Sequence, residues 1–425
     1  MFVDYQVFPM TSADLSTSEK NLCQDFHQLL GSNEPSLEDP EGKHLGRVII
    51  RRPLRGLGDN YTLRLKGQQT NCTQLDWAIK KANSNRTLLI VLAIDDPAYS
   101  AALSFRAREP DRVVVLNHRQ LQCVVESASP VDEVLALIRQ QISYLALVPF
   151  EVSSPAFGPF FFGRTSELKR LQSHQNYAIS GAGGMGKSSL LRQWIWLRRL
   201  TDRDAFERTV EVDLMGVPEP DAAARLITAA IQRKTSVRIA DSVAVTVRNF
   251  FDASVTLHRN YTKISNSSAP FHLVLDEVGS LIEVDRHRTL SDYFQQATAS
   301  GPDKSPFPFL QTLRKLVSDG VFRLTLCSRT ETRELLQHPM NPFCVDGNYS
   351  RLRPLEIGRL QDHEAEKMLT EPLRALGVDI EAYRDRIYDA LQKAGGVPFQ
   401  LADHGLDIAL DAEPANTPGC IQRNE

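Results

Sequence analysis

The feature that most constrains this chain is a glycine-rich run, Gly181–Ser189, with the sequence GAGGMGKSS. It matches the pattern G-x-x-x-x-G-K-[ST]; a short apolar run, 176–180, precedes it and an amphipathic run, 190–196, follows. We therefore expect a strand, a tight loop and a helix in succession. Glycines let successive backbone N–H groups face one anion, and the positive end of the following helix favours the same anion. The run therefore predicts a phosphate-binding loop (P-loop) inside an α/β fold.

Within the P-loop, two side chains have distinct expected roles. Lys187 is expected to reach the β- and γ-phosphates of a nucleotide, and Ser188 to hold Mg²⁺ through its hydroxyl. The other residues expected to line the phosphates are Gly181, Gly183, Gly184, Met185, Gly186 and Ser189. The alternative interpretation, a glycine-rich turn without a ligand, does not account for the strand before the loop and the helix after it.

Length, charge and cysteine usage restrict the remaining possibilities. The 425 residues suffice for two or three domains, and the net charge of −3 makes no case for a nucleic-acid or membrane partner. The six cysteines are scattered and form no C-x-x-C pair, which argues against a zinc ribbon and against a disulfide scaffold. The N-terminus has no leader-like pattern, and no apolar run approaches the ~20 residues of a membrane span, so we expect a cytoplasmic protein.

A second apolar run, Phe271–Leu275, leads directly into Asp276 and Glu277. We expect this run to be a buried strand beside the P-loop strand. Asp276 would then hold Mg²⁺, usually through water, and Glu277 would orient and deprotonate the attacking water. The alternative is a strand that ends in a solvated turn, and the P-loop about ninety residues earlier favours the catalytic interpretation.

A third apolar run, Leu324–Cys327, ends in Ser328 and Arg329. A strand here, next to the P-loop strand, would direct Ser328 or Arg329 at the γ-phosphate or at the attacking water. Such a residue detects whether the third phosphate is present. The alternative is a surface arginine that caps a strand.

Alternating patterns of period 2 and period 3.6 divide the chain into parts. We expect a polar segment over 1–45, a small α/β domain over 46–147, a linker or extended strap over 148–160, a three-layer core with a parallel sheet over 161–350, a C-terminal helical subdomain over 351–410 and a tail over 411–425. Strands are expected at 47–51, 61–66, 87–94, 112–116, 176–180, 209–212, 271–275 and 322–327. Helices are expected near 21–30, 73–83, 97–106, 118–126, 131–146, 219–233, 241–257, 305–318, 361–375, 382–394 and 398–410.

Taken in this order, the motifs of residues 160–410 resemble those of STAND ATPases (signal-transduction ATPases with numerous domains) and their AAA+ relatives. Phe161–Leu168 resembles the entry motif F-x-G-R-x-x-E-L, the P-loop resembles G-x-G-G-x-G-K, and Cys327–Arg329 resembles the T-T-R sensor. Leu352–Leu355 resembles the stretch that opens the helical lid of the family, and Gly395–Phe399 resembles the G-x-P motif of that lid.

The resemblance implies ATP and Mg²⁺ as cofactors, slow hydrolysis, and a switch that responds to ATP and ADP. It implies that Phe162, Gly163 and Arg164 run past the adenine and ribose, and that Pro398 packs against the adenine. It also implies self-association or another protein chain as partner. An arginine finger from a neighbouring protomer is not assigned; the candidates are Arg314, Arg329 and Arg333.

The N-terminal α/β domain faintly resembles Mrr-like members of the restriction-endonuclease-like fold, through Gly58-Asp59 and the strand that ends Arg64-Leu65-Lys66. Because Arg64 stands where these nucleases place a second metal-binding acid, a degenerate fold or an unrelated adaptor is favoured over an active nuclease. Asp95 and Asp96 form a carboxylate pair at a strand end, or, equally, Asp96 before Pro97 is the N-cap of a helix. A basic cluster would either bind nucleic acid or form a solvated face; it comprises Arg47, Arg51, Arg52, Arg55, Arg64 and Lys66.

Overall fold

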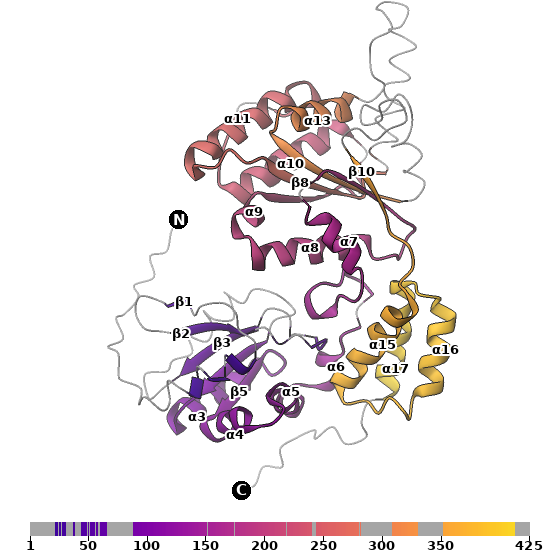
Figure 1. Cartoon of the computed structure of the whole chain (residues 1–425). Coiled ribbons are helices and arrows are strands. Elements are labelled where there is room, and N and C mark those ends of the chain that lie inside the picture. The colour runs from indigo at the N-terminus through magenta and orange to yellow at the C-terminus, as the bar shows by residue number, and fades with distance from the viewer. Residues whose placement is uncertain are drawn as a thin grey trace, which may run out of the picture.

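The structure is a computed structural model of the whole chain. It describes residues 22–23, 25–26, 28–30, 37–38, 44–48, 50, 52–55, 57, 60–65, 88–150, 152–173, 175–217, 219–239, 244–279, 281, 308–329 and 352–412. Figure 1 shows three parts: an N-terminal α/β domain, a larger α/β core, and a helical lid drawn in yellow.

The core is built on a sheet of five parallel strands. Their spatial order is β10 (Arg353–Glu356), β6 (Tyr177–Ser180), β9 (Phe322–Ser328), β8 (Phe271–Asp276) and β7 (Thr209–Asp213). Parallel strands require crossovers, and the chain supplies them as helices. The core helices are α7 (Thr165–Leu171), α8 (Lys187–Thr201), α9 (Arg203–Glu207), α10 (Pro220–Thr235), α11 (Val247–Ser265) and α13 (Pro308–Ser318).

Helices cover both faces of this sheet, so the predicted three-layer α/β core is confirmed (Figure 1). Along β8, Leu273 and Leu275 pack toward α10, α11 and α13, whereas Val274 packs toward α7 and α8. Alternate residues of a strand face opposite sides of the sheet, so a continuous apolar run is what a doubly covered strand needs.

The expectation that β8 lies beside the P-loop strand is wrong. β9 lies between β6 and β8 and pairs with both, with Ser180 opposite Ser328 and Leu275 opposite Leu326. The prediction that β9 borders the P-loop strand is confirmed. These strands are buried on both faces, so their hydrophobicity alone does not rank them by position in the sheet.

The stretch expected to open the lid is instead an edge strand of the core. β10 pairs in parallel with β6, Leu355 opposite Ile179. Arg353 and Ile357 donate their N–H groups to this neighbour, at 2.8 and 2.7 Å. The backbone nitrogen of Pro354, which has no hydrogen to donate, faces away from β6. An edge strand tolerates proline at such a position.

A buried polar cluster ties the P-loop helix α8 to the sheet. The Arg198 guanidinium donates to Thr209 Oγ1 at 3.0 Å, lies 3.2 Å from His272 Nδ1, and stacks over the Trp194 ring at 4.3 Å. Because an arginine has only donors, His272 Nδ1 accepts and Nε2 donates, 2.9 Å away, to Thr325 Oγ1. Burial lowers the pKa of Arg198 to about 10, which leaves the group charged at neutral pH.

The N-terminal domain also has a sheet covered on both faces. Its strands follow in order, β1 (Leu37–Glu38), β2 (His44–Val48), β3 (Asn60–Leu65), β4 (Leu89–Ala93) and β5 (Val113–Asn117), with β3, β4 and β5 parallel. Its helices are α3 (Asp96–Arg106), α4 (His118–Glu126), α5 (Pro130–Gln141) and α6 (Tyr144–Leu147). The side chain of Gln141 bonds both the N–H and the C=O of Val115, at 2.9 Å each, and so blocks the free edge of β5.

The structure changes two sequence predictions on this domain, and others fall on residues outside the described ranges. The carboxylate that caps α3 is Asp95, whose Oδ1 accepts from Ala98 N at 2.9 Å, while Asp96 is the first helical residue. The single helix expected over 131–146 is divided between α5 and α6, because Ser143 caps the second one. The helix at 73–83 and Asp59, Lys66 and Arg51 lie outside the described residues, as do the side chains of Arg47 and Arg64.

The lid consists of α15 (Asp362–Leu376), α16 (Arg384–Ala394) and α17 (Pro398–Asp411), close to the three predicted ranges. In Figure 1, α15 and α17 lie on the side of the lid that faces α5 and α6 of the N-terminal domain, and α16 lies on the far side. None of the helices in the described ranges combines the length and apolar content that crossing a membrane requires.

Candidate nucleotide site

The residues predicted to bind a nucleotide meet at one edge of the core sheet. Because all five strands are parallel, their carboxyl ends lie along the same edge. Ser180, directly before the P-loop, is opposite Ser328 at the end of β9, and Asp276 ends β8 one strand further. The fold therefore brings together the P-loop, the Asp276-Glu277 pair and the predicted sensor, although β9 separates the first two.

The P-loop has the backbone conformation that its glycines permit. Gly184 and Gly186 have φ values of +76° and +80°, in the left-handed region that other residues avoid, and α8 begins at Lys187. Lys187 is buried, and its Nζ donates to the carbonyls of Gly181 and Ala182 at 2.9 and 3.2 Å. The ammonium group is thus held inside the curl of the loop, at the N-terminus of the helix, where an anion is favoured.

Asp276 and Glu277 leave β8 in a strained turn. Asp276 is 7% exposed, and its Oδ1 accepts from the Glu277 N–H at 3.0 Å. Glu277 has φ +53°, a conformation that costs a non-glycine residue about 1 kcal/mol. Its carboxylate lies 3.8 Å from Arg329 Nε. The turn therefore points the two carboxylates in different directions, Asp276 into the protein and Glu277 toward Arg329.

At the end of β9, Ser328 supplies an unpaired buried group. Its hydroxyl is fully buried, and it has no hydrogen-bond partner among the residues that the structure describes. A buried hydroxyl without a partner costs about 1–3 kcal/mol, so such a group requires an explanation. A nucleotide oxygen or a bound water at this sheet edge would supply the missing partner. This observation fits the predicted ligand.

The sequence placed Cys327 in the sensor-like stretch but predicted no role for its side chain. Burial, reinforced by the charge of Asp276 and a hydrogen bond to it, raises the pKa of the Cys327 thiol well above its usual value. The thiol therefore keeps its proton and donates to Asp276. A cysteine at the end of an apolar strand has no distinctive sequence pattern, so only the packing of β9 against β8 reveals the contact.

The lid lies directly against the P-loop. The Phe399 N–H, in the first turn of α17, donates to the Gly184 carbonyl at 3.2 Å. A Cβ placed on Gly184 would lie 3.1 Å from Phe399 Cβ, and one on Gly186 would lie 3.7 Å from Pro398 Cγ. The predicted lid residue Pro398 is therefore brought to the P-loop, while its contact with an adenine stays a prediction.

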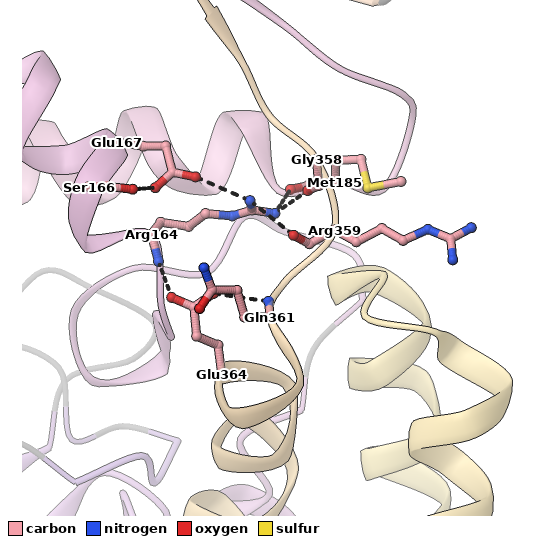
Figure 2. Close-up of polar contacts among 8 residues, drawn as sticks. All are labelled: Arg164, Ser166, Glu167, Met185, Gly358, Arg359, Gln361 and Glu364. Carbon is pink, nitrogen blue, oxygen red and sulfur yellow. Dashed lines mark hydrogen bonds and ion pairs between the residues drawn. The ribbon is translucent and has the colours of Figure 1, made fainter.

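Arg164 forms a clasp between the P-loop, the lid and the segment that joins lid to core (Figure 2). Its guanidinium donates to the carbonyls of Met185, Gly358 and Arg359, and its backbone N–H donates to the Glu364 carboxylate at 3.0 Å. The guanidinium also pairs with Glu167 at 3.3 Å, and Arg164 is only 6% exposed. A planar fork of five donors suits this set of oxygens. The side chain predicted to run past a nucleotide is thus bonded to protein atoms.

The segment around 156–158, which precedes α7 and β6, is docked on α8 and is called the strap below. The Ala156 N–H donates to Ser189 Oγ at 3.0 Å, and the Gly158 N–H donates to Gln193 Oε1 at 2.5 Å. Ser189, expected at the phosphates, therefore directs its hydroxyl to the strap. For Phe162 and Gly163, the structure places the chain next to the lid, since a Cβ on Gly163 would overlap the Glu364 carboxyl group.

An Arg164→Ala substitution is expected to lower the free energy of unfolding by about 2–3 kcal/mol, because several buried oxygens lose a charged donor together. Arg164→Lys is expected to recover little, since an ammonium group does not span these oxygens. Urea unfolding measures the change. Arg170→Ala is the control: Arg170 also donates to a carbonyl, Pro354 O, but is exposed, so we expect a change below about 0.5 kcal/mol. Equal losses for both variants would contradict the clasp.

Several predicted residues lie away from the sheet edge or outside the described chain. Arg314 lines a groove between α11 and α13, and a second groove lies beside α10, so neither groove belongs to this site. Arg333 lies outside the described residues. Within the described residues there is no cluster of three His, Cys, Asp or Glu side chains that would hold a metal. A Mg²⁺ site from Ser188 and Asp276 would accordingly need phosphate oxygens and water to complete it.

Comparisons with solved structures find distant similarities in fold. The Walker-type ATPase PABY2304 of Pyrococcus abyssi is 15% identical, with 62% of this chain and 75% of that chain covered and a TM-score of 0.40. The Aeropyrum pernix ORC1 protein in complex with DNA is 16% identical, with 59% of this chain and 61% of that chain covered and a TM-score of 0.38. A search of curated proteins returns no match.

A family model described as novel STAND NTPase 1 (nSTAND1) matches residues 144–405, more than half of the chain. The match spans the strap, the P-loop, the strands that carry Asp276 and Ser328, and the lid up to α17. It agrees with the resemblance carried by the motifs at Phe161–Leu168 and Gly395–Phe399. The chain therefore belongs to the nSTAND1 family of P-loop NTPases.

Proposed function

We propose that this protein is a switch that binds ATP with Mg²⁺ and hydrolyses it slowly, so that the lid changes position with the nucleotide. The observation that carries the proposal is the meeting of four features at one sheet edge. These are the P-loop with buried Lys187, the carboxylates of Asp276 and Glu277, and the unpaired hydroxyl of Ser328.

In the proposed site, each side chain has one task. Lys187 and the P-loop N–H groups hold the β- and γ-phosphates, and oxygens of Ser188 and Asp276 hold the metal. Bound Mg²⁺ neutralises charge on the phosphate oxygens. Glu277 takes the proton of the attacking water.

Arg329 and Ser328 would make the site sensitive to the third phosphate. Arg329 lies 3.8 Å from Glu277 and is 65% exposed, so it is free to turn toward an anion. Once a γ-phosphate competes for Arg329, the Glu277 carboxylate is released to accept a proton. Ser328 is already aligned at the same edge. We propose these two residues as the sensor.

The lid supplies the response. Its first turn bonds a P-loop carbonyl through Phe399, and the Arg164 clasp bonds the segment that leads to it. A nucleotide that contacts both the P-loop and the lid favours one lid position over another by its differential contacts. The proposed outcome of that change is self-association or binding of another protein chain.

Turnover and molecular mass, measured on the same preparation, test this function. We expect Mg²⁺-dependent release of phosphate from ATP at a rate below about 1 s⁻¹, faster than from GTP. Size-exclusion chromatography with light scattering is expected to give different masses with ADP and with a non-hydrolysable ATP analogue. Full activity in excess EDTA would refute the metal role, and a single mass in every nucleotide state would refute the assembly step.

A further inference from the structure

The lid helices bury their apolar residues against the N-terminal domain and not against the nucleotide-binding core. One continuous buried cluster joins the two parts. From the N-terminal domain it includes Leu121, Ile138 and Leu147, from the residues directly after that domain Val148 and Phe150, and from the lid Leu369, Leu373, Leu401, Ile408 and Ala409. The buried residues of the core form separate clusters on the two faces of its sheet.

The chain crosses between the core and the joint cluster at two short segments: the first crossing follows Phe150, and the second is Gly358-Arg359. Along the second crossing, Ile357 belongs to the core cluster and Leu360 to the joint cluster, with only Gly358 and Arg359 between them. Along the first crossing, Phe150 belongs to the joint cluster, and the strap after it docks on α8. The chain thus passes twice between two bodies. At the second crossing, the Arg164 guanidinium donates to the carbonyls of Gly358 and Arg359.

Specific contacts fix the lid on the N-terminal domain. The buried Tyr144 hydroxyl donates at 2.8 Å to the carbonyl of Ala409, in the last turn of α17, where carbonyls lack a partner within the helix. The Phe150 ring presses on the backbone at Gly405: a Cβ there would lie 2.6 Å from Cδ1 and 2.7 Å from Cζ. A glycine inside a helix weakens that helix, so its close fit to this ring accounts for its presence.

The contacts between lid and core are of a different kind. Apart from the close approach of Pro398 and Phe399 to Gly186 and Gly184, they are hydrogen bonds. The Phe399 N–H donates to the Gly184 carbonyl, the Arg164 N–H donates to the Glu364 carboxylate, and the Arg164 guanidinium donates to the carbonyls at 358–359. When the lid moves, the groups that make these polar contacts can bond water or a ligand instead, which offsets much of their loss. A dry interface of leucine and phenylalanine side chains has no such substitute, because exposing it costs the full hydrophobic contribution.

We infer that the lid and the N-terminal α/β domain form one rigid body, so that any nucleotide-driven movement of the lid carries the N-terminal domain with it. In that case the N-terminal domain moves together with the lid when the nucleotide changes, and it is not an independent domain joined by a flexible linker. The existence of the joint body stands on the packing alone; its movement rests on the proposed function.

The first test needs no nucleotide. Hydrogen exchange is compared for the full-length protein, Gly405→Leu, and the control Asp403→Leu, which adds the same side chain to an exposed position of the same helix. Gly405→Leu is expected to speed exchange by about tenfold or more in α15 and α17 and also in α5 and β5, while β8 and β9 of the core keep their rates. Gly405→Ala serves as the milder variant if Gly405→Leu does not fold.

Removing the opposing ring tests the contact itself. In the double variant Gly405→Leu with Phe150→Ala, the leucine gains the space of the ring, and protection is expected to return in both the lid and the N-terminal domain. The joint body is refuted if Gly405→Leu accelerates exchange in the lid while the N-terminal domain keeps the rates of the wild-type protein.

The second test follows movement with spin labels. Cys123 in α4 is exposed and takes one label. The second label is placed either in the lid, at Lys393→Cys, or in the core, at Asp319→Cys, both exposed positions. To prevent labelling elsewhere, Cys72, Cys344 and Cys420 are changed to serine. On adding Mg²⁺ and a non-hydrolysable ATP analogue, we expect the distance from 123 to 319 to shift by several ångströms and that from 123 to 393 to stay constant. A shift between 123 and 393 overturns the inference. Two constant distances together with the joint loss of protection would refute the switch but not the joint body.

Discussion

A Lys187→Ala variant is expected to lose nucleotide binding, with no increase in melting temperature when ATP and Mg²⁺ are added. In the wild-type protein, ligand at 100 times its Kd stabilises the folded state by about 2.7 kcal/mol, which a thermal shift assay detects. Lys187 is the one P-loop side chain that carries a positive charge, and its Nζ lies among the loop carbonyls at the start of α8. Without it, the phosphates lose their principal counter-charge.

The control must separate loss of binding from loss of folding, because Lys187 is buried and bonded to Gly181 and Ala182. Lys187→Met keeps most of the apolar stem and removes only the ammonium group. Lys169→Ala, at an exposed position of α7, removes a lysine charge elsewhere in the core. We expect Lys187→Met to lose the shift and Lys169→Ala to keep it. A full thermal shift in the folded Lys187 variants would show that nucleotide binds elsewhere.

A Glu277→Gln variant is expected to bind ATP with Mg²⁺ normally but to hydrolyse it about 10²–10⁴ times more slowly. Glutamine keeps the size of the side chain and its ability to bond Arg329, but it no longer accepts the proton of the attacking water. The strained turn at φ +53° holds residue 277 at the sheet edge in either variant. Single-turnover phosphate release measures the chemical step, and the thermal shift checks binding.

Asp213→Asn is the matched control for Glu277→Gln. Asp213 ends β7, opposite Asp276, and its Oδ1 accepts from the Met215 N–H, a contact that asparagine preserves. We expect this change to leave turnover close to that of the wild-type protein. If Glu277→Gln hydrolyses ATP as fast as the control does, another group is the base. If Glu277→Gln binds ATP but hydrolyses it slowly, as expected, the variant also provides an ATP-bound state for the spin-label distance measurements.

The local elements were predictable from sequence because their physical causes are local. The short apolar runs at Phe271–Leu275 and Leu324–Cys327 predict strands, and the pattern at 181–189 predicts a loop followed by a helix. The structure confirms these elements. Parallel strands align their carboxyl ends, so the sequence also predicted that Asp276 and Ser328 would lie near the P-loop.

The lateral order of the strands was not predictable in the same way. The runs at β8 and β9 are both buried on two faces, and nothing in either run specifies which of them borders β6. For β10, the proline at 354 and the exposed charges around Leu355 conceal a strand. Pairing along a sheet depends on which crossovers fit over its faces, and that is a property of the assembled layers.

By itself, the sequence determined that this chain has a P-loop core with a second acidic strand and a C-terminal group of helices, since glycine spacing and apolar periods act over a few residues; that these helices form a lid was implied by the family resemblance. Only the tertiary structure decided what the lid packs on and what Arg164 holds. Those depend on surfaces that meet across distant segments, as Phe150 meets Gly405 and Arg164 meets Gly358. A buried apolar residue has the same sequence pattern whichever partner buries it, so the joint body of lid and N-terminal domain appears only when the elements are packed together.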